Sequence, residues 1–303
     1  MKGLGMLMIK YQLGLSSEPI TENPCALLDG VGLLRGEYLC RYKKEYFTIA
    51  SCREYVKSYI ENVLDIFSSQ EVWYRTSEFS CEEINILKGC DHNLYEKQSL
   101  FGNRGIRRSI LYPDIFDLEL EIISEISKRH SNLHILFPFV TDDTEMKFCV
   151  SRLQQHGFTN LYGAMIEIPA AYHFIEQFID LGITNFTIGL NDLTTFIFGV
   201  RRGYPGHNIT HKIIYSFIEN VVKKVNHRAT VSVAGYLNKE FADYAINLGI
   251  QKLIIHYSDL NKVLAVPLDR LPYYDHLKKI KKMERQRSNN RDLVKIHLEE
   301  MVL

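Results

Sequence analysis

The sequence lacks the features that define several large classes of protein. None of its six cysteines belongs to a Cys-x-x-Cys pair, which argues against a zinc site or a disulfide framework and favours reduced thiols. No run reaches the roughly 18 apolar residues that a membrane-spanning helix needs. The short apolar start is interrupted by Lys10 and no small-residue cleavage site follows, so we expect no secretory signal. We therefore expect a cytoplasmic protein without a membrane partner.

The sequence also lacks an excess of charge of either sign. Lys and Arg together number 36, Asp and Glu together number 36, and the formal net charge is zero. General nucleic-acid binders are usually basic, because phosphate contacts supply most of their affinity. We therefore expect no nucleic-acid partner, although a local pocket for a small anion is compatible with this balance. The basic stretch 276–287 is interpreted as a solvated C-terminal helix, with an anionic partner as the alternative.

What is present is an ordinary globular composition, with 46% hydrophobic and 24% charged residues. Short runs rich in Val, Ile, Phe and Leu show little alternation, as expected of parallel strands that are buried on both faces. The expected strands are 6–13, 30–35, 71–75, 133–140, 162–167, 185–190, 229–234 and 252–256. The expected helices between them are 52–68, 115–129, 144–156, 170–180, 208–225 and 239–248.

This alternation predicts an α/β fold, and most simply a (β/α)8 TIM barrel. An open doubly wound sheet is the alternative, but no Gly-x-Gly-x-x-Gly follows the first expected strand, which disfavours its dinucleotide-binding form. We expect a single barrel over 1–270 with an insertion at about 76–131 that covers one barrel end. A C-terminal helical extension is expected over 271–303.

Candidate functional residues lie at the ends of the expected strands, where TIM barrels build their active sites. They are Arg35, Arg75, Arg104, Glu167, Asn191, Asp192 and Arg202. Guanidinium groups match phosphate and carboxylate oxygens, and two carboxylates can hold Mg²⁺ together with water and substrate oxygens. Each residue alone also fits a surface ion pair, a turn or a helix cap. Their joint occurrence predicts a site for a small, strongly anionic ligand such as a phosphorylated carboxylic acid.

Six segments carry a resemblance to a known family. They are GVGLLRGEYL at 30–39, VWYRTSEF at 72–79, LFGNRGIR at 100–107, FPFV at 137–140, GAMIEIPAA at 163–171 and IGLNDLTT at 188–195. Together they resemble the C-terminal barrel of the PEP-utilising enzymes, where PEP is phosphoenolpyruvate. That family includes phosphoenolpyruvate synthase, pyruvate phosphate dikinase and enzyme I of the sugar phosphotransferase system. The resemblance runs from about residue 6 to 265 and implies the (β/α)8 barrel of the phosphoenolpyruvate/pyruvate superfamily.

The resemblance also implies a role for each candidate. Phosphate and carboxylate oxygens would be held by Arg35, Arg75, Arg104 and Arg202. Mg²⁺ would be bound by Glu167 and Asp192. The phosphoryl group would be held by Asn191, which with Arg35 and Arg75 forms the implied catalytic set. In the family, a phosphohistidine on a separate swivelling domain exchanges its phosphoryl group with the pyruvate or PEP bound in this barrel, and positioned charges carry most of such chemistry.

The sequence departs from the family pattern in three ways. Ala234 stands where a cysteine of the family exchanges a proton with the substrate, and alanine cannot transfer a proton. Tyr236 is a candidate substitute, although an ordinary tyrosine pKa near 10 suits neutral pH poorly. Arg201 replaces a usual Asp and adds positive charge at the barrel mouth. The family's ATP-binding and phosphohistidine domains are missing from this sequence, so we expect any phosphotransfer to need a partner protein that carries them.

Three functional hypotheses remain open at this point. The first is a phosphotransferase subunit that presents a small acceptor, with a substrate other than pyruvate because the proton-transferring cysteine is replaced. The second is a stand-alone Mg²⁺-dependent lyase or condensing enzyme that works through an enolate. The third is a non-catalytic binding or scaffold protein on the same fold. A homodimer is also compatible with the resemblance.

Overall fold

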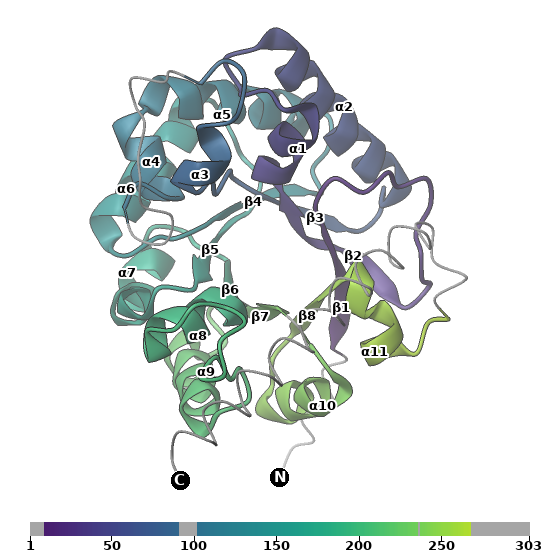
Figure 1. Cartoon of the computed structure of the whole chain (residues 1–303), viewed down its shortest axis with the longest axis vertical. Helices are drawn as coiled ribbons and strands as arrows, with labels where there is room; N and C mark the ends of the chain where they lie inside the picture. The colour runs from purple at the N-terminus through teal and green to yellow at the C-terminus, as the bar shows by residue number, and fades with distance from the viewer. Residues whose placement is uncertain (1–8, 91–101, 236, 268–303) are drawn as a thin grey trace, which may run out of the picture.

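The computed structural model describes residues 9–90, 102–235 and 237–267. Eight parallel strands form a closed barrel in which each strand pairs with the next along the chain and the last pairs with the first (Figure 1). The strands are β1 (Lys10–Leu15), β2 (Leu28–Arg35), β3 (Glu71–Arg75), β4 (Leu133–Phe137), β5 (Tyr162–Ile166), β6 (Asn185–Gly189), β7 (Thr230–Gly235) and β8 (Lys252–His256). The predicted (β/α)8 barrel is confirmed.

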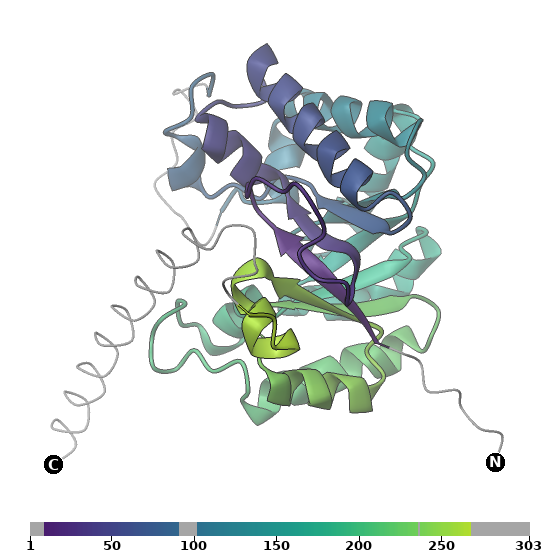
Figure 2. The same cartoon turned by 90° about the vertical axis from the view of Figure 1, so that its right-hand side faces the viewer.

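Helices surround this barrel on the outside (Figure 1). The helices of the N-terminal half and those of the C-terminal half lie on opposite sides of the strands (Figure 2). They are α1 (Gly36–Lys43), α2 (Ala50–Ile66), α3 (Cys81–Ile84), α4 (Ile106–Leu111), α5 (Pro113–Ser127), α6 (Asp143–Gln155), α7 (Ile175–Asp180), α8 (Leu190–Phe198), α9 (Lys212–Val225), α10 (Lys239–Leu248) and α11 (Leu260–Leu264). Short 3-10 helices span Pro169–Phe174 and Tyr257–Asp259.

The outer helices bury one face each against the strands. In α9 the buried residues are Ile214, Ile218, Val221 and Val225, and their spacing of three and four residues places them along a single stripe. Side chains at the helix starts satisfy free backbone N–H groups. Asp142 accepts a hydrogen bond from the Glu145 N–H of α6 at 2.9 Å. Among the described residues, no helix is both long and apolar enough to cross a membrane.

The barrel interior is layered. Its middle layer is apolar and takes one residue from each of six strands, namely Leu33, Trp73, Leu136, Met165, Ala234 and Ile254. Below it, toward the strand starts, Lys252 donates to Glu71 at 2.5 Å and Trp73 donates to the same carboxylate at 3.1 Å. These two layers fill the lower part of the barrel among the described residues, and the open space lies at the carboxyl ends of the strands.

Several element boundaries differ from the sequence prediction. The first strand was expected over 6–13; within the described residues it begins at Lys10 and continues to Leu15. Helix α8 was not predicted, because β6 ends at Gly189 and α8 begins at Leu190 without a connecting loop. The expected insertion at 76–131 contains α3, α4 and α5. The single domain over 1–270 stays a prediction, and the expected helical extension over 271–303 lies outside the described residues.

Candidate active site

A cavity of about 580 Å³ opens at the carboxyl ends of the strands. Six of the seven predicted site residues line it, namely Arg35, Arg75, Glu167, Asn191, Asp192 and Arg202. The seventh, Arg104, reaches the same place through an ion pair with Glu78. The structure therefore brings all seven together, although they come from β2, β3, α8 and three loops.

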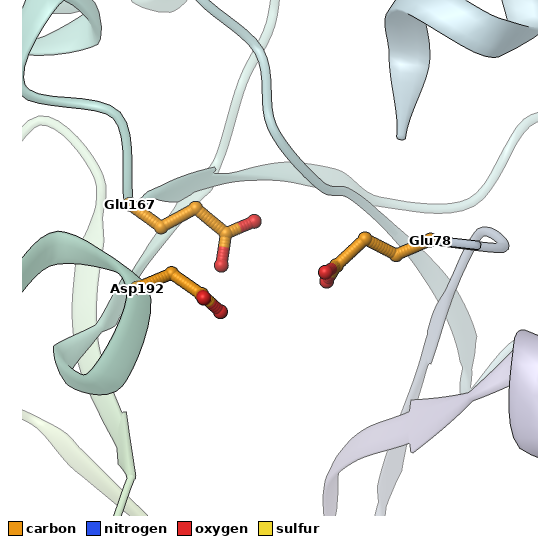
Figure 3. A group of neighbouring side chains, drawn as sticks. All are labelled: Glu78, Glu167 and Asp192. Atoms are coloured by element: carbon orange, nitrogen blue, oxygen red, sulfur yellow. The ribbon is translucent and has the colours of Figure 1, made fainter. Parts of the chain in front are cut away.

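Three carboxylates face one another within this site. Glu78 follows β3, Glu167 follows β5 and Asp192 lies in the first turn of α8, and one oxygen of each lies within 4.8 Å of the others. Figure 3 shows Glu78 pointing toward the other two from the opposite side. Their residues are only 3%, 1% and 7% exposed, respectively. Because burial penalises negative charge, such a cluster needs compensating positive charge.

The sequence analysis missed Glu78. Its side chain returns to the site from three residues beyond the end of β3, so a search of strand ends does not reach it. The signal that could have found it is the polar run RTSE at 75–78, because polar residues that directly follow a buried parallel strand belong to the functional end of a barrel.

Local backbone geometry holds Glu167 in place. Its Oε1 accepts a hydrogen bond from the Phe139 N–H at 2.9 Å, and Phe139 has a left-handed φ of 56°, which is unusual for a bulky residue and typical of functional sites. Gly189 makes room for the carboxylate, because a Cβ there would lie 2.7 Å from Glu167 Oε2. Burial and the charges of Glu78 and Asp192 raise the pKa of Glu167 well above its ordinary value.

Arginines surround the three carboxylates. Arg75 pairs with Glu37 of α1 and with Glu78. Arg104 also pairs with Glu78, and Phe139 lies beneath its guanidinium with 4.5 Å between the Cζ atom and the ring centre. Burial alone would lower the pKa of Arg75, but the carboxylates of Glu37 and Glu78 outweigh it and raise that pKa. Arg75 therefore keeps its positive charge inside the barrel.

The remaining arginines lie nearer the cavity mouth. Arg202 pairs with Asp192. Burial alone would lower the pKa of Arg202, but the carboxylate of Asp192 outweighs it and raises that pKa. Arg35 donates to the Ser16 hydroxyl and stacks over Tyr38 at 4.1 Å. Arg201, one of the departures from the family pattern, is exposed and stacks over Tyr204 at 5.0 Å, and it is not among the described residues that line the cavity.

The donor set fits a hard divalent cation. Carboxylate oxygens are the protein ligands that Mg²⁺ prefers. Asn191 Oδ1 is buried at the cavity and has no hydrogen-bond partner among the described residues, which is the state expected of an atom that meets a ligand. Glu167 and Asp192 could hold the cation, with Glu78 opposite them as a third oxygen donor.

A second polar network supports the segment that carries Glu78. Glu119 of α5 accepts hydrogen bonds from the Tyr74 hydroxyl at 2.7 Å, the Ser77 N–H at 2.9 Å and the Ser77 hydroxyl at 2.8 Å. Burial raises the pKa of Glu119 to about 7, although these hydrogen bonds lower it. Glu119 thus anchors the residue next to Glu78, and the sequence analysis did not identify it.

Another wall of the cavity is formed by residues at the ends of β7 and β8. Ala234 lines it at the position where the resemblance implies a cysteine, so the described wall presents no thiol there. Tyr236, the suggested substitute, lies outside the described residues. His256, at the end of β8, and Ser258 line the same wall. The sequence analysis placed His256 at a strand end but gave it no role.

A family of known sequences matches most of this chain. A family model described as "PEP-utilising enzyme, PEP-binding domain" matches residues 15–266. A probable phosphoenolpyruvate synthase from Methanocaldococcus jannaschii is 27% identical over 244 residues, which cover 75% of this chain and 20% of that protein. The phosphoenolpyruvate synthase from Pyrococcus furiosus is 26% identical over 262 residues, which cover 80% of this chain and 32% of that protein.

The chain thus spans about a fifth to a third of the length of these relatives. Among solved structures, an HpcH/Hpal aldolase/citrate lyase family protein from Burkholderia cenocepacia aligns with a TM-score of 0.49 and 10% identity, covering 92% of this chain and 94% of that chain.

Proposed function

Because the chain belongs to the PEP-utilising enzymes through their PEP-binding domain, we propose that its barrel presents a small acid to a phosphoryl donor, as the acceptor part of a phosphoenolpyruvate-synthase-like phosphotransferase. The donor would be a phosphohistidine on another domain or protein. The observation that carries this proposal is the group of three buried carboxylates within 4.8 Å of one another, surrounded by arginines at the open end of the barrel.

The roles follow from the chemistry of the side chains. Glu167 and Asp192 would hold Mg²⁺, which supplies positive charge next to the oxygens of the phosphoryl group. Arg75 and Arg104 would bind carboxylate or phosphoryl oxygens through paired N–H donors. Asn191 would orient the phosphoryl group. Together these groups position the reactants and stabilise developing charge, which is most of what phosphoryl transfer requires.

The ion pairs suggest that cation and anion binding depend on each other. Arg202 is paired with Asp192, and Arg104 is paired with Glu78. A cation that takes these carboxylates weakens their hold on the two arginines, whose N–H donors then become available to an anion. We therefore expect the cation to increase the affinity for the anion.

The alanine at position 234 favours an acceptor that needs no proton transfer at carbon. Phosphorylation of a hydroxyl or a stable enol requires no proton transfer at carbon, so it is compatible with alanine at this position. A purely structural role fits the site less well, because burying three carboxylates lowers the folding stability and a scaffold does not require them. The proposed acceptor is therefore a small hydroxy or enol acid.

A thermal-shift titration tests the proposed site. Oxalate is a suitable probe because it is a small planar dianion that binds Mg²⁺. Mg²⁺ and oxalate together should raise the Tm, since a ligand at 100 times its Kd stabilises the native state by about 2.7 kcal/mol. Glu167→Gln should abolish the shift. Glu125→Gln is the matched control, because Glu125 is an exposed glutamate of α5. A full shift in Glu167→Gln, or none in the unaltered protein, would contradict the proposal.

A further inference from the structure

The loop between α8 and α9 carries Arg202, one of the arginines of the site. It spans 199–211 and begins at Gly199, whose left-handed φ of 64° ends α8. In the described part of the chain, the backbone hydrogen bonds of residues 200–210 all lie within this loop. The position of Arg202 relative to the cavity therefore depends on the side chains that attach the loop to its surroundings.

Two side chains of this loop reach the first turn of α8. Arg202 pairs with the Asp192 carboxylate, and His207 Nε2 lies 3.0 Å from the backbone oxygen of Asn191. Because a carbonyl oxygen can only accept, Nε2 carries a proton and His207 is the donor. The two partners are adjacent in α8, and both line the cavity. The loop is thus attached at the site itself.

Two consecutive turns connect His207 to Arg202. The Tyr204 N–H donates to the Arg201 carbonyl at 3.2 Å, and the His207 N–H donates to the Tyr204 carbonyl at 3.0 Å. The Arg201 guanidinium also stacks over the Tyr204 ring. Arg202 lies inside the first of these turns, so an attached His207 limits how far Arg202 can move from the cavity.

The two attachments respond differently to a cation. The proposed cation takes the Asp192 carboxylate and so competes with Arg202 for it. The bond from His207 uses a backbone oxygen instead, and it remains when the cation is bound. The Arg202 side chain is 47% exposed, so without this second attachment the released guanidinium could turn toward solvent.

We propose that His207 is a positioning residue that keeps Arg202 at the cavity mouth after the cation has taken Asp192, so that the released guanidinium binds the anion. This inference rests on the proposed function and concerns how the same site holds its anion. An arginine that is already in place loses less conformational freedom on binding, which increases the affinity.

The test measures the Kd of oxalate by calorimetry at a saturating concentration of Mg²⁺. His207→Leu should raise this Kd at least about fivefold, which is the effect of one lost hydrogen bond, and should leave the Kd of Mg²⁺ alone unchanged. His207→Gln, which keeps an N–H donor, should restore most of the oxalate affinity. His173→Leu, a substitution of an exposed histidine outside the site, should bind both ligands like the unaltered protein.

The helix should tolerate the loss of the imidazole. The Asn191 carbonyl also accepts a hydrogen bond from the Thr195 hydroxyl at 3.0 Å, so His207→Leu does not leave this oxygen without a donor. His207 itself is only partly buried. His207→Leu should therefore fold like the unaltered protein, which its urea denaturation curve checks.

A double-mutant cycle separates positioning of Arg202 from a structural role. Arg202→Gln should weaken oxalate binding, and adding His207→Leu to it should cause no further loss, because His207 acts through Arg202. Equal losses from His207→Leu with and without Arg202→Gln would show that the histidine only shapes α8, and would overturn the inference. Weaker binding of Mg²⁺ alone in His207→Leu would overturn it too, as would an unchanged oxalate Kd in Arg202→Gln.

Two further outcomes separate this inference from the function on which it rests. If oxalate binds with Mg²⁺ and its Kd is the same in His207→Leu and in the unaltered protein, only the role of His207 is overturned. Failure of the unaltered protein to bind oxalate with Mg²⁺ would overturn the proposed function, and the inference with it.

Discussion

Glu78 interacts with four other charged groups of the site. It pairs with Arg75 and Arg104 and faces Glu167 and Asp192. Burial raises the pKa of Glu78, while the two arginines lower it. A change at this position therefore affects both the proposed cation site and the balance of the buried charges.

We expect Glu78→Gln to destabilise the protein and to weaken Mg²⁺ binding. The substitution removes a negative charge from between two arginines, of which Arg75 keeps its ion pair with Glu37, and should cost about 2 kcal/mol in free energy of unfolding. Urea denaturation with and without Mg²⁺ and oxalate measures both effects. Glu83→Gln, at a more exposed glutamate paired with Arg41, is the control. Unchanged stability and an unchanged Mg²⁺ response would contradict the shared role of Glu78.

The raised pKa of Glu167 predicts the pH dependence of cation binding. A proton competes with the cation for this carboxylate, so Mg²⁺ affinity should fall as the pH is lowered, beginning above the ordinary titration range of a glutamate, with proton release on binding. Calorimetry in buffers of different ionisation enthalpy measures the released protons. The folding stability of the protein without Mg²⁺ should change with pH in the opposite direction. A raised pKa of Glu167 in the folded state stabilises the fold at low pH, and that contribution is lost as the pH rises. An Mg²⁺ affinity that does not change as the pH is lowered would count against a role for Glu167.

Strand ends explain which site residues could be predicted. Arg35 and Arg75 are the last residues of β2 and β3, so recognition of the strand was enough to place them. Glu78 and Glu119 could not be placed in this way. The position of Glu78 depends on the path of the loop after β3. Glu119 lies in α5, 42 residues along the chain from Ser77, to which it is hydrogen-bonded.

At the scale of elements, α5 supports the loop after β3 through Glu119. The pKa of Glu119 is raised from 4.5 to about 7, so its stabilising contribution is present below about pH 4.5 and is lost as the pH rises through about pH 7. This shift corresponds to about 3 kcal/mol. The free energy of unfolding should therefore fall as the pH rises through about pH 7, because burial penalises the ionised carboxylate.

Glu119→Gln should remove this pH dependence. The amide oxygen can accept the same three hydrogen bonds without becoming charged, so the variant should gain stability relative to the unaltered protein as the pH rises, by up to about 3 kcal/mol. Denaturation curves between about pH 4.5 and pH 8 measure the difference. Glu125→Gln on the same helix should show no such gain. Parallel pH profiles for Glu119→Gln and the unaltered protein would contradict the assignment.

Local patterns predicted the strands better than the short helices. The third and eighth strands have the expected bounds, Glu71–Arg75 and Lys252–His256, because each is a compact apolar run. Helices α1 and α8 begin at the residue after a strand ends, so the sequence offers no loop signal that separates the two elements. In α8 this direct connection places Asn191 and Asp192 in the first helical turn, where both line the cavity.

At the scale of the whole molecule, the barrel gathers charged residues from distant parts of the chain above a closed interior. The apolar layer and the Lys252–Glu71 pair seal the lower half, and the site occupies the upper half. The arginines are held by carboxylates that the proposed cation would take. We therefore expect one cation and one anion to bind this cavity together.

A calorimetric cycle with Mg²⁺ and oxalate tests whether the two ligands bind together. Each ligand is titrated in the absence and in the presence of a saturating concentration of the other. We predict that each increases the affinity for the other by the same factor, at least about tenfold, since coupling between two ligands is reciprocal. Calorimetry corrected for the binding of Mg²⁺ to free oxalate gives this factor. Independent binding of the two, or binding of oxalate with equal affinity when Mg²⁺ is absent, would contradict the account.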